Sequence, residues 1–102
     1  MAVSLQVLYP ISEGSTFDYD YYAKTHLGLV EQHLGPFLDK VLVTKGHAGG
    51  PDIPPAFYAI ATMTFADQAA FDGAMGATGP VLADIPNYTN CTPQMLIGEV
   101  IG

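Results

Sequence analysis

The run FYAIATMTF, residues 57–65, constrains the fold of this chain more than any other segment. Its residues have strong β-preference, and in a strand successive side chains point to opposite faces of the sheet. One face of this strand carries a complete apolar row, formed by Phe57, Ala59, Ala61, Met63 and Phe65. Tyr58 and Ile60 begin a second apolar row on the other face. A strand that is apolar on both faces needs cover on both sides of its sheet.

Three other segments have the pattern of strands. Residues 3–9 alternate apolar and polar side chains and end at Pro10. Residues 41–44 and 93–101 carry apolar side chains on both faces. The linker GGPDIPP, which precedes the run at 57–65, is rich in residues that break regular structure. It therefore predicts a long hairpin loop between two antiparallel strands.

Two segments have the spacing of helices. Asp18 is expected to be the N-cap of a helix over residues 19–34, which Gly35 and Pro36 would end. A second helix is expected to begin near Asp67, because alanines and larger apolar residues follow at helical spacing. Residues 78–90 predict a short helical turn and a loop.

The order of elements is β-α-β-β-α-β over a single domain, residues 1–102. This order is typical of an α+β, ferredoxin-like fold, with a four-stranded antiparallel sheet and both helices on one face. The second face of the sheet then needs another cover, and a second copy of the same sheet provides it. We therefore expect a homodimer whose two sheets pack face to face as a dimeric α+β barrel. The alternative is a monomer with a partly solvated sheet.

The charge balance limits the ligands. Ten acidic residues stand against three lysines, there is no arginine, and the formal net charge is -7. This balance argues against nucleic acid as a partner. Without arginine, the chain also lacks the planar side chain that binds phosphates and carboxylates through two parallel hydrogen bonds. A neutral, hydrophobic small molecule fits better.

Cysteine usage and hydropathy bear on location. Cys91 is the only cysteine, so no disulfide can form within the chain, and a reducing cytoplasm is the expected location. No apolar run is long enough to cross a bilayer, so we expect no membrane partner. The sequence contains neither a GxGxxG motif nor a P-loop, and we expect no cofactor.

Four segments together resemble the EthD family, which is named from an ether-degradation gene cluster: VLYP, FDYDYYAKTHLGLVEQHLGP, FYAIATMTF and ADIPNYTNCTPQMLIGEV. The resemblance spans nearly the whole chain and implies a dimeric α+β barrel. Family members are associated with oxidative degradation and are often described as oxidoreductases. Similar folds include cofactor-free monooxygenases, muconolactone isomerases and polyketide cyclases. The fold alone does not decide among these activities.

The predicted helix over residues 19–34 carries the candidate catalytic residue. Tyr22, His26, Leu29, Val30 and His33 recur at spacings of three and four, so they share the apolar face that turns toward the sheet. An imidazole exchanges protons near neutral pH, which suits His26 to general acid/base catalysis. The alternative is a core histidine that donates to a carbonyl, and the resemblance of the TH pair to the family favours catalysis.

The other candidates surround this histidine. Tyr22 lies one turn before it, and His33 is expected at the pocket rim or in a structural role. The segment DIPNYTN joins the second helix to the last strand, so it predicts Asp84 and Tyr88 near a ligand, unless its residues only form a turn. Tyr9, at the end of the first strand, offers another hydroxyl. We expect no metal, because His26 and His33 are about 10.5 Å apart along a helix.

These features predict a small EthD-like enzyme that acts on a hydrophobic, oxygenated substrate with His26 as general acid and base. Cofactor-free oxidation of monooxygenase type and proton-transfer isomerisation or cyclisation both remain open. A non-catalytic binding or accessory protein for an oxidative degradation pathway is the alternative.

Overall fold

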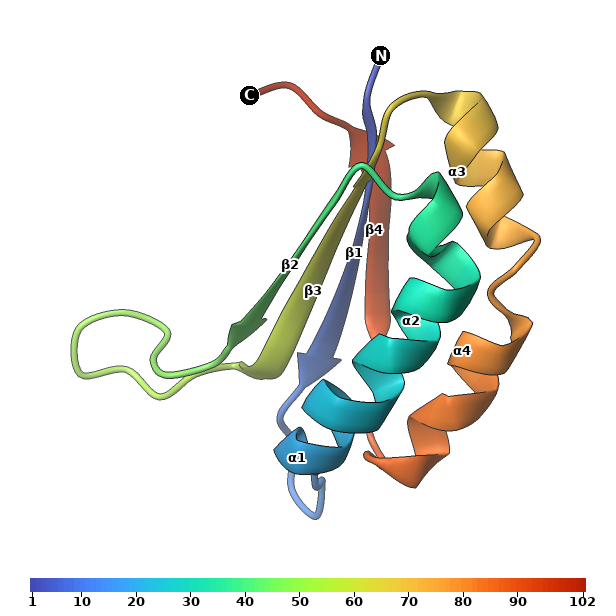
Figure 1. Ribbon diagram of the computed structural model, residues 1–102. Helices are drawn as coiled ribbons and strands as arrows, with labels where there is room; N and C mark the ends of the chain where they lie inside the picture. The colour runs from blue at the N-terminus through green and yellow to red at the C-terminus, as the bar shows by residue number, and fades with distance from the viewer.

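In the computed structural model, which describes residues 1–102, four antiparallel strands form one sheet and all helices lie on one face of it (Figure 1). The strands are β1 (Val3–Pro10), β2 (Lys40–Lys45), β3 (Phe57–Phe65) and β4 (Gln94–Glu99). Their order across the sheet is β2-β3-β1-β4. This arrangement confirms the predicted ferredoxin-like fold, and the last strand is shorter than predicted because it ends at Glu99.

The register of the sheet follows from its apolar rows. Leu5 of β1 lies opposite Met63 of β3 on one side and Ile97 of β4 on the other. Odd-numbered residues of β1 and β3 therefore share the face toward the helices, where both strands are buried in strict alternation. A slip by one residue would turn these apolar side chains toward solvent, which is why the pattern fixes the register.

The first helix covers the predicted range but is divided. It consists of α1 (Tyr19–Tyr21), a π-helical segment (Tyr22–His26) and α2 (Leu27–Leu34). Asp18 caps it as predicted, because its carboxylate accepts from the backbone N–H of Tyr21 at 3.1 Å. Gly35 does not adopt the left-handed conformation that we expected of a terminal glycine. The chain instead continues as a 3-10 turn over Gly35–Phe37, with Pro36 inside it.

The second helical region is α3 (Gln68–Met75), which Asp67 caps through the N–H of Ala70. A short helix, α4 (Gly79–Asp84), and a 3-10 turn, Ile85–Asn87, follow where the sequence predicted a helical turn. Figure 1 shows α2 and α4 side by side over the same end of the sheet.

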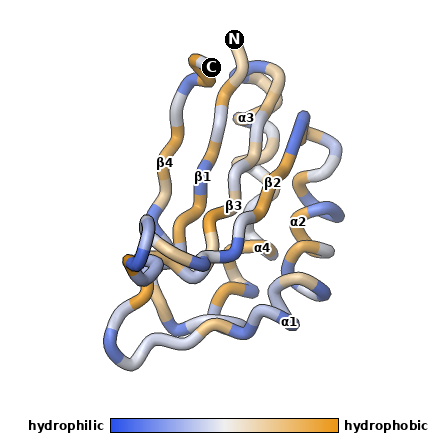
Figure 2. The backbone as a smooth tube through the Cα atoms, turned by 90° about the vertical axis from the view of Figure 1, so that its left-hand side faces the viewer, coloured by the Kyte–Doolittle hydropathy of each residue, from blue (hydrophilic) through white to orange (hydrophobic).

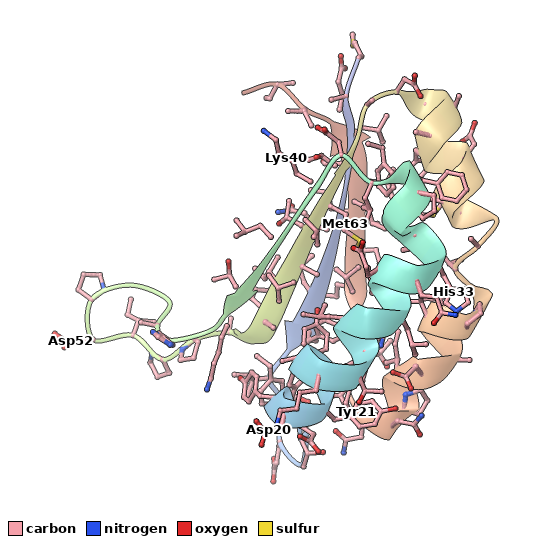
Figure 3. All side chains as sticks on the ribbon, in the orientation of Figure 1. Asp20, Tyr21, His33, Lys40, Asp52 and Met63 are labelled. Carbon is pink, nitrogen blue, oxygen red and sulfur yellow. The ribbon has the colours of Figure 1, made fainter.

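The core lies between this helical layer and the sheet. In Figure 3, Met63 points from β3 toward α2. Leu34 of α2 and Phe65 of β3 are the largest fully buried side chains. Burying a side chain of this size stabilises the fold by about 1.5–3 kcal/mol relative to exposing it. The buried apolar residues form one cluster that extends from Phe65 at one end to Tyr9 and Tyr88 at the other.

The opposite face of the sheet differs from the apolar surface that the sequence suggested. Figure 2 views the molecule from this side and shows the strands in the order β4, β1, β3, β2. Met95 and Ile97 lie in register with buried residues of β1, so they belong to the helix side, although half of each side chain is exposed. The outward face mixes apolar with polar side chains, and only Lys40 among them is charged: Ser4, Gln6, Leu8, Lys40, Leu42, Thr44, Ile60, Thr62, Thr64, Gln94 and Leu96.

The loop between β2 and β3, residues 46–56, projects away from the helical layer, with Asp52 at its tip (Figures 1 and 3). It closes on itself through the backbone bond from Gly49 to Ile53 at 2.8 Å. The two termini lie together at the opposite end of the sheet (Figure 1). None of the helices has both the length and the apolar character needed to cross a membrane.

Candidate active site

The π-helical segment presents Tyr22 and His26 to the sheet. The backbone N–H of Leu27 bonds to the carbonyl of Tyr22, five residues earlier, so this turn is wider than an α-helical turn. The two rings stack with their centroids 5.3 Å apart and their planes 21° apart. Single π-turns inside α-helices are frequent at functional sites, where they re-aim side chains. Here the turn contains both buried aromatic residues of the candidate site.

His26 forms a buried pair with Asp84, the last residue of α4. His26 Nδ1 lies 2.9 Å from Asp84 Oδ2, and the residues are 3% and 7% exposed. These two side chains come from positions 58 residues apart. A carboxylate in this position orients the imidazole and fixes which nitrogen carries the proton.

Two further groups hold the other oxygen of this carboxylate. The Tyr21 hydroxyl donates to Asp84 Oδ1 at 2.6 Å, and the Asn87 amide donates to the same atom at 3.0 Å. Burial alone would raise the pKa of Asp84, but the hydrogen bonds from Tyr21, Asn87 and His26 lower it below its ordinary value. Asp84 is therefore ionised at neutral pH, and its Oδ2 remains for the imidazole.

Burial lowers the pKa of His26 below its ordinary value, and the hydrogen bond and charge of Asp84 only partly oppose this shift. The imidazole is consequently neutral at pH 7. Because ionised Asp84 has no proton to donate, Nδ1 must carry the hydrogen, and Nε2 is left as an acceptor. This is the protonation state that a general base requires.

Nε2 contacts the first of two tyrosine hydroxyls that are hydrogen-bonded to each other. The Tyr88 hydroxyl lies 3.3 Å from His26 Nε2 and 2.8 Å from the Tyr9 hydroxyl. The Tyr9 ring, in turn, packs edge-on against Tyr22 with centroids 5.8 Å apart. Burial raises the pKa values of Tyr9, Tyr22 and Tyr88 above 10.0. All three hydroxyls therefore keep their protons at neutral pH.

Pairing between two distant loops brings Tyr88 to this position. Phe17 and Thr89 form an isolated β-bridge, and the N–H of Asp18 donates to the carbonyl of Tyr88 at 2.8 Å. The Phe17 ring then packs against both Tyr9 and Tyr88, with centroids 5.2 and 5.3 Å away. The segment before α1 and the segment after α4 thus close one end of the site together.

A narrow pocket lies between the helical layer and the sheet beside His26, and the space in it that is open to a water-sized molecule is about 40 Å³. Its walls come from β1, β2, β3, β4, α2 and α4, and fourteen of its fifteen lining residues are hydrophobic. The exception is His26, and the hydroxyl-bearing residues in the wall are Tyr9 and Tyr22. No lysine or acidic residue lines the pocket, so it suits an apolar molecule with little or no charge.

The structure brings together five of the six residues that the sequence singled out. His26, Tyr9 and Tyr22 line the pocket, whereas Asp84 and Tyr88 lie behind it and contact His26. His33 lies about two turns after His26, is partly exposed and does not line the pocket. No three potential metal ligands among the histidines, cysteines and acids lie close enough together to hold an ion.

Sequence reasoning missed the roles of Tyr21 and Asn87. Asn87 follows Asp84 by three residues in a turn-forming segment, so the turn pattern contained a signal for this contact. Tyr21 bonds to a residue 63 positions away, and nothing in the sequence marks that pairing.

Comparison with protein-family models and with curated proteins gave no match. Among solved structures, an EthD-like protein from Ralstonia eutropha JMP134 is 36% identical, over 99% of this chain and 93% of that one, with a TM-score of 0.87. The chain belongs to the EthD family. A second EthD family protein, from Bacillus halodurans C-125, is 25% identical over 99% of this chain and 100% of that one, with a TM-score of 0.77.

The EthD fold extends to more distant proteins. The cofactor-independent oxygenase SnoaB from Streptomyces nogalater has a TM-score of 0.67 to this chain, covering 99% of this chain and 94% of its own. Its sequence identity is only 10%, so the likeness is one of fold. Family membership confirms the resemblance seen in the sequence, and the site geometry provides the argument about chemistry.

Proposed function

We propose that this EthD-family protein is a proton-transfer enzyme for oxygenated, hydrophobic small molecules, with His26 as general acid and base. The observation that carries the proposal is the buried His26–Asp84 pair, 2.9 Å apart, at the polar end of an otherwise apolar pocket. A neutral imidazole oriented by an ionised carboxylate accepts a proton near neutral pH and can later return it. The absence of charged side chains from the wall supports a neutral substrate.

The first step is removal of a proton from a phenol or enol by His26. The resulting anion is electron-rich and has two onward reactions. It can react with dioxygen without a cofactor, or it can take a proton back at another atom, which isomerises the molecule; the molecule cyclises only if the anion first adds to an electrophilic carbon of the same molecule and the proton then returns to the group formed there. We place oxidation first, because SnoaB, which shares the fold, is a cofactor-independent oxygenase.

The experiment uses a panel of phenols and enolisable 1,3-diketones. Oxygen uptake reports the oxidation, and incorporation of deuterium from D₂O into carbon positions reports proton return. We expect at least one readout in the wild type and its loss in His26→Ala, whereas His47→Ala, in the loop between β2 and β3, should retain it. Retained activity in His26→Ala would contradict the proposal. Binding of panel members with neither reaction would identify a binding protein instead.

We further propose that the outward face of the sheet packs against a second copy of the chain. Register places one charged residue on this face, Lys40 at the edge strand β2. A chain of net charge -7 meets its copy with least repulsion where acidic residues are absent. Leu42 and Leu96 also expose 67% and 59% of their surfaces there. These observations support the homodimer, in which the two outward faces pack together.

A further inference from the structure

The hydrogen bonds of His26 raise a problem for direct proton transfer. Both ring nitrogens have partners within the protein: Asp84 at Nδ1, and the Tyr88 hydroxyl 3.3 Å from Nε2. Tyr88 is buried and does not line the pocket, whereas its own partner, Tyr9, does. The path of hydrogen bonds from Nε2 to the pocket therefore runs through two hydroxyl groups.

The direction of every bond in this path can be deduced. Nε2 has no proton, so the Tyr88 hydroxyl must donate to it. The oxygen of Tyr88 is then left to accept, and the Tyr9 hydroxyl must donate across the 2.8 Å contact. The oxygen of Tyr9 is then left to accept, and one of its two lone pairs remains free beside the hydrogen bond from Tyr22; both tyrosines line the pocket. A hydroxyl group that enters the pocket therefore finds an acceptor, as proton removal requires.

We propose that Tyr9 is the catalytic residue that takes the substrate's proton, and that Tyr88 relays a proton from Tyr9 to His26. This inference rests on the proposed function of His26 and deepens it. As the substrate O–H proton passes to the Tyr9 oxygen, the Tyr9 proton passes to Tyr88 and the Tyr88 proton to Nε2. Three O–H bonds break; two O–H bonds and one N–H bond form. The products are a substrate anion and an imidazolium paired with Asp84.

Burial supports a relay through side chains. Tyr9 and Tyr88 are 2% and 3% exposed, so bulk water has little access to replace either hydroxyl. Their raised pKa values, caused mainly by burial, mean that each hydroxyl passes a proton on without remaining ionised. The Tyr88–Nε2 contact is the longest link, and catalytic hydrogen bonds commonly shorten when substrate binds.

The relay also defines the substrate class. Its acceptor is a phenolic oxygen in an uncharged wall, so the group that it serves is itself an acidic hydroxyl, as in a phenol or a stabilised enol. The rest of such a molecule would lie between the apolar walls formed by residues such as Val30, Leu34 and Val81, which must move apart to admit it because the free space there is about 40 Å³. A ketone without an enol hydroxyl or an ether could occupy the same space but would have no proton to give.

The experiment uses 4-nitrophenol as probe, because its visible absorption distinguishes phenolate from phenol. A pH titration of the bound probe should show that it ionises at a lower pH in the wild type than in variants that lack the relay. In Tyr9→Phe and Tyr88→Phe, which keep the rings but lose the hydroxyls, the bound phenolate fraction should fall about tenfold, equal to one unit of apparent pKa. Tyr19→Phe is the matched control, because the Tyr19 hydroxyl donates to the backbone carbonyl of Tyr58 and takes no part in the proposed relay.

Binding of 4-nitroanisole, which has no proton to donate, should be the same in all these proteins and shows that the pocket is intact. Wild-type phenolate levels in Tyr9→Phe or Tyr88→Phe, together with loss of phenolate in His26→Ala, would overturn the relay but leave His26 as the base. Phenolate in His26→Ala would overturn the proposed function itself. A wild type that binds the probe only as neutral phenol, or not at all, would also overturn the relay.

Discussion

The hydroxyl of Tyr21 donates a 2.6 Å hydrogen bond to Oδ1 of Asp84, and this bond leaves Oδ2 for His26. One carboxylate thus links the start of the first helix, the π-helical segment and the end of α4. Its two oxygens have separate tasks, because Oδ1 receives the structural bonds and Oδ2 orients the imidazole. The expected consequences of changing each partner differ accordingly.

Asp84→Asn should lower turnover by about a hundredfold or more, within the range of general acid/base contributions. An amide can donate to Nδ1, which would move the imidazole proton to Nε2 and remove the acceptor. Steady-state rates on a substrate from the phenol and diketone panel measure this effect. Asp52→Asn, at the tip of the long loop, makes the same chemical change away from the site. Equal rates in both variants would show that Asp84 does not determine which nitrogen of His26 carries the proton.

Tyr21→Phe should have a smaller effect, about two- to tenfold on turnover, the value of a single hydrogen bond. Asn87 still donates to Oδ1 in this variant, so the carboxylate stays in place. The loss of one donor should also raise the pKa of Asp84, which carbon NMR of the carboxyl group can follow. A loss as large as that of Asp84→Asn would mean that Tyr21 has a direct part in the reaction.

Stability should fall as the pH is lowered. Folding lowers the pKa of His26 below 6.5, so below that pH the unfolded state binds more protons than the folded state. The free energy of unfolding therefore decreases as the pH falls. The pKa of Asp84 is also depressed, so its contribution is present above 3.8 and is lost as the pH falls through its folded value. Urea unfolding between pH 8 and pH 5 should show a decline that is weaker in His26→Gln. An identical decline in that variant would show that titratable groups other than His26 cause the pH dependence of stability.

Leu96→Glu should convert the proposed homodimer to monomer, because it places a carboxylate on each of two facing sheets. Light scattering after size-exclusion chromatography gives the mass directly. Gln32→Glu adds the same charge on the exposed side of α2 and should leave the dimer intact. A wild type that is monomeric at micromolar concentration would contradict the proposal.

The fold could be predicted because its information is local. The sequence predicts the two alternating strands at residues 3–9 and 57–65, the helix starts at Asp18 and Asp67, and the order of elements. The structure confirms each of these predictions. The π-turn was not predictable, because it leaves the spacing of Tyr22 and His26 unchanged. The polar character of the outward sheet face was misjudged, because apolar residues near the ends of β3 and β4 were extended to whole rows.

The candidate site was predictable only in part. Histidine chemistry and helical spacing indicated His26, and its burial is consistent with that choice. The pairing with Asp84 depends on a contact across 58 residues, which only the packing of α4 against α2 creates. For the same reason, the hydroxyl chain from Tyr9 to Tyr88 emerges only when the two loop segments pair.

The most direct test of the account is nitrogen NMR of the His26 side chain across a pH titration, with the signal assigned by its absence in His26→Gln. We expect a neutral ring at pH 7 that carries its proton on Nδ1, with a pKa below 6.5. A ring that is protonated at pH 7, or a neutral ring with its proton on Nε2, would contradict the assignment of His26 as the base.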